Sequence, residues 1–193
     1  PWDFENADRP TQKILREQHK QARTGYTVRP SIGHWFVNDL ENPYSEIKRF
    51  DWMRGYHVGG RSIMWGRHSY RWGDIDFEAN AKDGIAVDWP IRYSDLAPWY
   101  DHVERFAGIS GSREGLPQLP DGQFLPPMEL NCVEKDIASR IKAHYKAQRH
   151  MFIGRVANLT APVNGRSQCQ FRDRCWEGCP FGAYFSTQSS TLP

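Results

Sequence analysis

Long apolar segments are missing from this chain of 193 residues. No stretch approaches the roughly eighteen consecutive apolar residues of a membrane-spanning helix, so no membrane span is expected. The N-terminus also lacks the charged-then-apolar pattern of a secretory leader. Because the chain begins at Pro1 without a methionine, the sequence leaves its targeting and localisation open.

An excess of charge of either sign is missing as well. The 25 lysines and arginines against 23 aspartates and glutamates give a net charge of +2. Neither nucleic acid nor an anionic membrane surface is therefore expected as a partner. Apolar residues make up 39% of the chain and the mean hydropathy is -0.72, which is low for a compact domain, and eight Trp, eight Tyr and ten Phe compensate in part.

A glycine-rich stretch runs from Arg54 to Gly66 and reads R-G-Y-H-V-G-G-R-S-I-M-W-G. The adjacent Gly59 and Gly60 permit positive φ angles and let backbone N–H groups approach a ligand without a Cβ in the way. That property suits a phosphate-bearing cofactor. The apolar letters I-M-W that follow would suit a flat ring system. The residues alone leave a second interpretation open, a glycine-rich turn between two strands.

Three of the four cysteines fall within eleven residues in the pattern C-x5-C-x3-C, namely Cys169, Cys175 and Cys179. Thiolates this close can converge on one iron–sulfur cluster, although the spacing matches neither standard ferredoxin pattern. A disulfide would leave one of the three unpaired or pair it with Cys132. Zinc would need a fourth ligand and lacks a C-x2-C knuckle. The spacing keeps these interpretations open, and Cys132 is most simply a small buried hydrophobe.

Two short helices are expected in the first half of the chain. Thr11 is a cap for the first, and the second lies within Arg71–Gly84, with Asp74 or Asp76 near its cap and Gly84 as its stop.

The aromatic segment Ser31–Pro43 is predicted to pack on the main body as a strand or loop. His34 and His57 stand beside aromatic residues. They are expected to be packed or hydrogen-bonded rather than catalytic.

A longer helix is predicted between Ser94, as its cap, and Gly108, as its stop, with Pro98 in the first turn where its missing N–H matters least. Apolar residues recur along it at helical spacing and predict an amphipathic helix docked on a core. These residues are Leu96, Trp99, Val103 and Phe106.

The second half combines irregular and regular segments. Gly108–Pro127 is rich in Gly, Pro and Ser and is predicted to be an irregular loop, either a lid over a site or a spacer. Asn131 and Glu134 form a capping pattern for a helix that runs to about Tyr145. Loose alternation of apolar residues over Met151–Pro162 predicts a strand.

Three blocks together resemble the glucose-methanol-choline (GMC) family of FAD-dependent oxidoreductases, in the branch of bacterial sugar dehydrogenases. They are the glycine-rich stretch, W-P-I-R-Y-S-D-L-A-P-W-Y (Trp89–Tyr100) and G-C-P-F-G-A-Y-F-S-T (Gly178–Thr187), in the family's order. The similarity covers about Tyr44 to Pro193. The family's G-x-G-x-x-G fingerprint and its C-terminal catalytic histidine with a His or Asn partner are missing, so the chain is expected to be the middle of a longer enzyme.

The resemblance implies an α/β fold, α+β as a fragment, within a loop-rich two-domain flavoprotein that has several helices and short strands. Residues 44–110 and 150–193 would belong to the FAD-binding domain, and residues 108–150 to a lid or substrate-side excursion. It also implies that FAD is bound without a covalent bond, because Met64 stands where one branch of the family has the histidine that bonds to the flavin. The residues it implies for contact with FAD are Gly59, Gly60, Arg61, Ser62, Trp65, Gly66 and Arg67.

The resemblance further implies a three-iron, four-sulfur cluster on Cys169, Cys175 and Cys179. The substrate would be a sugar or polyol, with a small subunit and a cytochrome acceptor as partners and a periplasmic or membrane-associated location. The catalytic base would lie outside this chain, so no catalytic residue is assigned. Two other functions stay open, an iron–sulfur electron-transfer module and a secreted, disulfide-stapled carbohydrate-binding domain.

Overall fold

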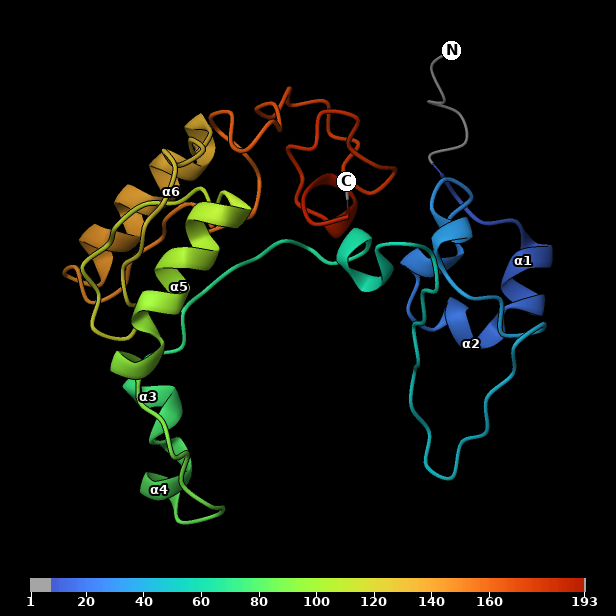
Figure 1. Ribbon diagram of the computed structural model, residues 1–193, viewed down its shortest axis with the longest axis horizontal. Helices are drawn as coiled ribbons and strands as arrows, with labels where there is room; N and C mark the ends of the chain where they lie inside the picture. The colour runs from blue at the N-terminus through green and yellow to red at the C-terminus, as the bar shows by residue number, and fades with distance from the viewer. Residues whose placement is uncertain (1–7, 193) are drawn as a thin grey trace. The chain divides into compact units, whose positions relative to one another are not determined.

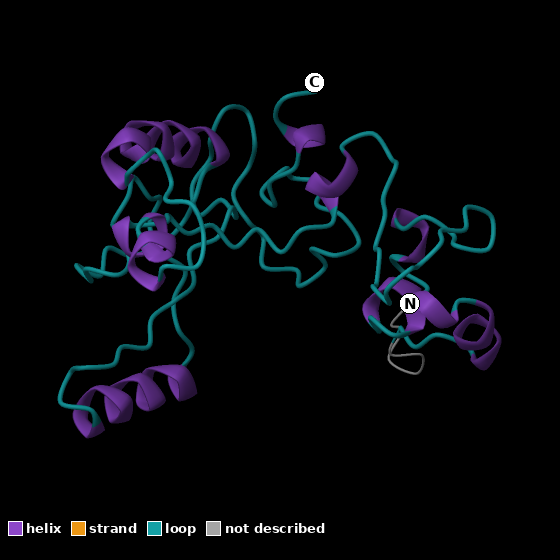
Figure 2. Ribbon diagram, turned by 90° about the horizontal axis from the view of Figure 1, so that it is seen from below, coloured by secondary structure: helices purple, strands orange, loops and turns teal. Residues whose placement is uncertain are grey.

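The computed structural model describes residues 8–192 (Figure 1). In this part of the chain, helices are joined by long irregular segments, and Figure 2 shows no strand among them. The α-helices are α1 (Gln12–Glu17), α2 (His19–Ala22), α3 (Asp74–Phe77), α4 (Ala79–Asp83), α5 (Tyr93–Ala107) and α6 (Cys132–His144). The 3-10 helices are η1 (Tyr26–Val28), η2 (Gly33–Trp35), η3 (Gly60–Ile63) and η4 (Thr187–Ser189). No helix within these residues is long and apolar enough to cross a membrane.

The helix-rich, loop-rich character predicted from the sequence is confirmed, but the short strands appear among residues 8–192 only as isolated bridges. Met151–Pro162 explains why. Its Arg155, Ala157 and Leu159 are buried in alternation, as in a strand. Yet the N–H groups of Val156, Ala157 and Leu159 donate to Ser110, Arg67 and Ala183 in three different segments. A β-ladder requires successive hydrogen bonds to a single neighbouring strand, so the strand prediction is wrong here.

The chain divides into two compact units. The described part of the first unit is 8–65, 173–179 and 186–192, and the second unit is 66–172 and 180–185. The expected assignment of residues 44–110 and 150–193 to an FAD-binding domain concerns a longer polypeptide and stays a prediction.

In the first unit, helix α1 begins as predicted. Thr11 Oγ1 accepts a hydrogen bond from Ile14 N at 3.2 Å, which satisfies one of the N–H groups that a first turn leaves unpaired. Ile32 and Phe36 then form the apolar core with Met64 of the glycine-rich stretch, against which Trp35, Met53 and Ile63 pack. The segment Ser31–Pro43 therefore packs as a loop, as one of its two predicted forms.

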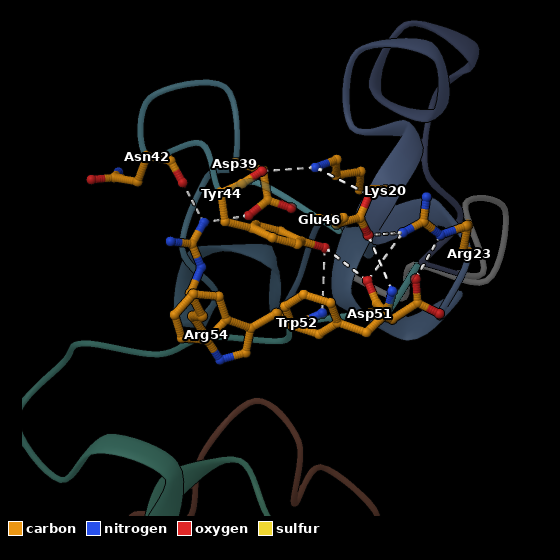
Figure 3. A network of polar contacts seen from close by, with 10 residues as sticks. Lys20, Arg23, Asp39, Asn42, Tyr44, Glu46, Asp51, Trp52 and Arg54 are labelled. Atoms are coloured by element: carbon orange, nitrogen blue, oxygen red, sulfur yellow. Dashed lines mark hydrogen bonds and ion pairs between the residues drawn. The ribbon is translucent and has the colours of Figure 1, made fainter. Parts of the chain in front are cut away.

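Contacts between cations and aromatic rings hold the segment 39–54 against α2 (Figure 3). The ring of Tyr44 lies near two cations, 4.0 Å from Lys20 Nζ and 5.2 Å from the guanidinium carbon of Arg54. Lys20 also donates to the Tyr44 carbonyl at 3.1 Å. Arg54 forms a 2.6 Å ion pair with Asp39, and Arg23 of the adjoining turn forms a 2.6 Å ion pair with Asp51. These contacts therefore hold the segment that leads up to Gly55, the first glycine of the glycine-rich stretch.

In the second unit, α3 and α4 occupy the region predicted as one short helix. Asp76 Oδ2 accepts from Gly73 N at 2.9 Å at the start, and Gly84 ends α4 with φ +67. Both the acidic cap and the glycine stop are confirmed.

Helix α5 differs from its prediction at the start. Its N-cap is Arg92 rather than Ser94, because Asp95 Oδ2 accepts from Arg92 N at 2.8 Å and closes the first turn two residues earlier. Pro98 consequently lies inside the helix and not in its first turn. The stop is confirmed, since Gly108 has φ +74 and donates to the Glu104 carbonyl at 2.9 Å.

The apolar stripe of α5 is not docked as predicted. Trp99 is 67% exposed and Val103 is 55% exposed, whereas the buried residues of the helix are Glu104 and Ala107. Helix α6 is likewise capped by Asn131 and Glu134 as predicted, yet it has no buried residue. The periodicity therefore located these helices correctly but did not identify the faces that they bury.

An ion pair explains why α5 buries a charged face. Arg71, 5% exposed, donates from Nε to Glu104 Oε1 at 2.7 Å and from Nη2 to Glu104 Oε2 at 2.5 Å. It also bonds Asp101 and the Tyr93 hydroxyl. Burial by itself would lower the pKa of Arg71, but the hydrogen bonds to Glu104, Asp101 and Tyr93 raise it. Each of the three guanidinium nitrogens of Arg71 thus has a hydrogen-bond acceptor, which compensates for the burial of its charge.

The loop Gly108–Pro127 is anchored to the body of the unit. Arg155, with no exposed surface, donates to the Pro120 carbonyl at 2.7 Å and to Asp121 at 2.8 Å. Burial tends to raise the pKa of Asp121, but the N–H groups of Glu114 and Gly115 and the charge of Arg155 outweigh it and lower that pKa. The irregular structure is confirmed, and whether the loop acts as a lid or a spacer stays a prediction.

We expect Glu104→Ala to lower the free energy of unfolding of the second unit by about 3–5 kcal/mol, because it leaves the Arg71 guanidinium buried without its main counterion. Glu129→Ala removes a carboxylate that pairs with Lys135 at 2.9 Å but is 86% exposed, so it should leave the free energy of unfolding almost unchanged. Urea unfolding followed by tryptophan fluorescence measures both. Equal losses for the two variants would contradict the structural role of the buried pair.

Candidate functional site

The glycine-rich stretch forms a tight turn and not a connection between strands. Gly59 and Gly60 have φ angles of +95 and +50 and lead into η3. Gly60 N donates to the His57 carbonyl at 2.7 Å, and Ser62 N donates to the Gly59 carbonyl at 3.1 Å. The sequence analysis expected Gly59 and Gly60 to permit positive φ angles, and both adopt them here.

A hydroxyl pair joins this turn to η4. Ser62 Oγ lies 2.9 Å from Thr187 Oγ1, 125 residues away in the chain, and accepts from Thr187 N at 3.0 Å. Gln188 Nε2 donates to the Val58 carbonyl at 2.8 Å. The first and third blocks of the sequence resemblance therefore meet within the first unit. Thr187 was not predicted as a site residue, although its hydroxyl in the S-T pair of the third block was the available signal.

The space around the two glycines differs. A Cβ on Gly59 would lie 2.9 Å from Gln188 Cγ, so this glycine is required for packing within the protein. A Cβ on Gly60 would have no atom within 4 Å, so the face of the turn at Gly60 is open. Arg61 is exposed beside it and donates to the Met53 carbonyl. An open backbone face next to a guanidinium fits a phosphate-bearing group at Gly60 and Arg61.

The remaining residues predicted to contact FAD have other surroundings. Ser62 is occupied by the bonds to Thr187 and to the Gly59 carbonyl, and Trp65 is half-buried. Gly66 and Arg67 belong to the second unit. Arg67 is 2% exposed, donates from Nε to the Phe185 carbonyl at 2.8 Å and lies 3.3 Å from the centroid of the Tyr184 ring.

The two apolar residues after the turn belong to the core. Met64 is 9% exposed, and its Cε would lie 2.2 Å from a Cβ on Gly55. Ile63 packs on the same cluster. In this structure Ile63 and Met64 therefore support the turn from the apolar core. Their contact with a flat ring, which the sequence suggested, stays a prediction.

The two histidines have aromatic neighbours, as predicted. The ring of His34 lies 4.4 Å from that of Trp35, and the ring of His57 lies between Tyr56 and Trp35 at 5.3 Å from each. His57 Nδ1 is buried without a hydrogen-bond partner among the described residues. No geometry here identifies either histidine as a proton acceptor.

The cysteines provide suitable donors for a cluster and are divided between the two units, with Cys169 in the second and Cys175 and Cys179 in the first. Cys169, Cys175 and Cys179 are half-buried, and no disulfide links the four cysteines of the chain. Within residues 8–192, no group of three His, Cys, Asp or Glu side chains is arranged to hold a metal ion. Cys132 is exposed, so the prediction that it is buried is wrong. It occupies the first position of α6, a helix without a buried face.

No protein-family model matches the chain. The chain is similar to a 2-methyl-1,2-propanediol dehydrogenase of Mycolicibacterium austroafricanum, with 39% identity over 140 residues that cover 70% of the chain and 24% of the relative. It is also similar to a fructose dehydrogenase large subunit of Gluconobacter japonicus, with 25% identity over 131 residues covering 67% of the chain and 24% of the relative. A paromamine 6'-oxidase of Streptomyces fradiae is 36% identical over 62 residues, covering 31% of the chain and 12% of that protein.

These relatives are all named as dehydrogenases or oxidases. Similarity to oxidoreductases of this kind agrees with the class inferred from the three sequence blocks. The chain spans about a quarter of the length of the first two. Its similarity therefore concerns one portion of a larger enzyme architecture.

We predict that Ser62 and Thr187 are energetically coupled. In a double-mutant cycle, Ser62→Ala and Thr187→Val should show a coupling energy of about 1 kcal/mol, because either change alone already removes the hydrogen bond between the two hydroxyl groups. Pairing Ser62→Ala with Ser139→Ala, on the exposed surface of α6, should give additive changes in the free energy of unfolding. Free energies of unfolding from urea titrations provide all the terms. Additivity of the Ser62 and Thr187 changes would show that the link contributes nothing.

Proposed function

We propose that this chain is part of a GMC-type, FAD-dependent oxidoreductase that oxidises a CH–OH group of a polyol or sugar. The observation that carries the proposal is the 39% identity, over 70% of the chain, to a dehydrogenase named for a diol. The similarity to a fructose dehydrogenase large subunit and to a paromamine 6'-oxidase supports the same class of reaction. The three sequence blocks support it independently.

Binding of FAD is supported by the turn at Gly60. The open backbone face at Gly60 would leave room for the pyrophosphate, and the exposed Arg61 would bind it, since a guanidinium favours phosphate oxygens. Ser62 and Thr187 would keep the turn in shape, and the Ile32, Phe36 and Met64 core would support it from below. When bound, FAD supplies the two-electron acceptor for the hydride of the alcohol carbon.

Arg67 is better placed to position the backbone of this protein than to bind FAD. Its contacts with the Phe185 carbonyl and the Tyr184 ring already use the guanidinium, so within this proposal it fixes the backbone after Gly66. No residue of this chain is proposed as the catalytic base. Substrate choice, the small subunit and the cytochrome acceptor belong to the same proposal and concern the longer enzyme.

We expect the polypeptide that contains this chain to hold its flavin without a covalent bond, so that acid precipitation releases yellow flavin into the supernatant. Gly60→Val should greatly reduce the flavin content, because the branched side chain covers the open backbone face. Gly165→Val introduces the same kind of residue at another positive-φ glycine with no atom within 4 Å, and it should leave the flavin content unchanged. Absorbance at 450 nm relative to protein measures both.

Flavin retained in the washed acid pellet would contradict the non-covalent assignment. Equal flavin content in the two glycine variants would contradict the site at Gly60. The 193-residue chain alone is expected neither to bind FAD tightly nor to turn over alcohols, because the glycine fingerprint that holds most of the pyrophosphate is not in it.

Cys169, Cys175 and Cys179 are proposed as ligands of a three-iron, four-sulfur cluster. The support is the number and chemistry of the donors, since three thiolates match a cuboidal cluster that lacks one iron. Because Cys169 belongs to the second unit and Cys175 and Cys179 to the first, no step of the reaction is derived through the cluster.

The cluster prediction is tested by iron and acid-labile sulfide in anaerobically purified protein. Cys175→Ser should remove most of both, because it deletes one of three ligands, whereas Cys132→Ser should retain them. Absence of iron, together with a mass increase of two blocked thiols for each bridge broken on reduction and alkylation, would indicate a disulfide instead. Iron and sulfide without flavin would favour the electron-transfer module.

A further inference from the structure

The charges of this chain are unevenly distributed along its sequence. Residues 137–172 contain seven lysines and arginines and no aspartate or glutamate, although the net charge of the whole chain is only +2. Two of the seven, Arg155 and Arg166, are buried, and four others are exposed in α6 and just after it. The four exposed residues are Arg140, Lys142, Lys146 and Arg149. The second unit therefore has a positively charged surface that the net charge of the chain does not reveal.

Helix α6 presents this surface without contributing to the core, since none of its residues is buried. Val133, Ile137, Arg140 and His144 are all exposed, and their spacing places them along one face of the helix. We call this face, together with Lys142, Lys146 and Arg149, the basic surface. Its apolar members, Val133 and Ile137, are 62% and 42% exposed. A partner of this surface must therefore offer both apolar groups and negative charge.

An exposed surface of that kind is present elsewhere in the same unit. Residues 74–92 form α3, α4 and the segment that leads into α5, and they carry five carboxylates against two cations, Lys82 and Arg92. Asp83, the last residue of α4, is exposed. Large apolar side chains are exposed among these carboxylates, namely Ile75, Ile85 and Val87. We call residues 74–92 the acidic arm, and it combines the two properties that the basic surface requires.

The basic surface and the acidic arm do not meet within one molecule. Both belong to the second unit. In Figure 1, α3 and α4 lie beyond the start of α5 and away from α6, and Figure 2 shows the same separation. A contact between them therefore requires a second copy of the chain. Because each copy carries both surfaces, two copies related by a twofold axis can form two such contacts at once.

We propose that two copies of this chain associate through their second units, with the basic surface of each against the acidic arm of the other. A nucleic acid or an anionic membrane would attract α6 but be repelled by the acidic arm, whereas a second copy offers each surface the opposite charge. The association goes beyond the proposed function, because neither flavin nor an iron–sulfur cluster takes part in it.

The test is sedimentation velocity of the 193-residue chain over a range of protein concentrations. A dimer is expected at low salt. Raising NaCl from about 0.05 M to about 0.5 M should weaken the dimer at least about tenfold, because the added ions screen the exposed charges. The double variant Lys142→Glu, Lys146→Glu and the single variant Asp83→Lys should each be monomeric, since each places like charges against one another.

Mixing the two variants provides the decisive measurement. In a pair of one copy of each, the reversed α6 faces the reversed acidic arm, and the native α6 faces the native acidic arm. Equal amounts of the two should therefore form a mixed dimer, which also shows that both variants are folded. The double variant Lys48→Glu, Arg49→Glu reverses two exposed cations of the first unit and should retain the dimer of the unaltered chain.

Four results would overturn the proposal. The first is a monomer at every concentration, and a monomer that binds poly-L-glutamate would assign the basic surface to a different acidic partner. The second is failure of the two variants to associate when mixed. The third is an equal loss of the dimer in the Lys48→Glu, Arg49→Glu control. The fourth is a dimer that withstands salt but is lost in Trp99→Ser, which would identify the exposed apolar stripe of α5 as the interface.

Discussion

The pairing of Arg71 with Glu104 is the constraint on which the second unit depends. Glu104 accepts two bonds from Arg71 and a third, at 2.7 Å, from the N–H of Gln123, so one carboxylate joins α5, the segment before α3 and the loop Gly108–Pro127. Gly122 is part of the same constraint, because a Cβ there would lie 2.3 Å from Glu104 Oε2. A buried carboxylate is tolerated at this position because Arg71 and the Gln123 N–H donate to it and Gly122 leaves room for it.

Arginine side chains perform in this unit much of the cross-linking that aliphatic side chains perform elsewhere. Arg67, Arg71, Arg155 and Arg166 are each 5% exposed or less. Arg166 donates to the carbonyl groups of Phe106 and Ala107 at the end of α5, where the helix leaves acceptors unpaired. Burial lowers the pKa of Arg166. Its Nε and Nη1 have no hydrogen-bond partner in the part of the chain that the structure describes. Long planar donors that reach several carbonyls explain how a chain of mean hydropathy -0.72 packs.

Capping residues and glycine stops in the sequence predicted where helices begin and end, but not which faces the helices bury. Thr11, Asn131, Gly84 and Gly108 cap or end helices as predicted, because a cap depends on residues within one turn of it. The buried face of α5 was not predictable from its apolar period, since Arg71, 33 residues from Glu104, decides which face turns inward. The turn at Gly59 and Gly60 was readable from the glycine pair, whereas its bond to Thr187 depends on tertiary contact.

The hydrogen bonds between Ser62 and Thr187 also affect the order in which the two units can be completed during synthesis. The two residues are separated by 125 positions, and a ribosome adds about 5–20 residues each second, so Thr187 is made about 6–25 s after Ser62. During that interval residues 66–172 emerge and can fold as most of the second unit. The glycine turn and its apolar support therefore cannot contact η4 until Thr187 has been synthesised. The first unit is therefore begun first and completed last.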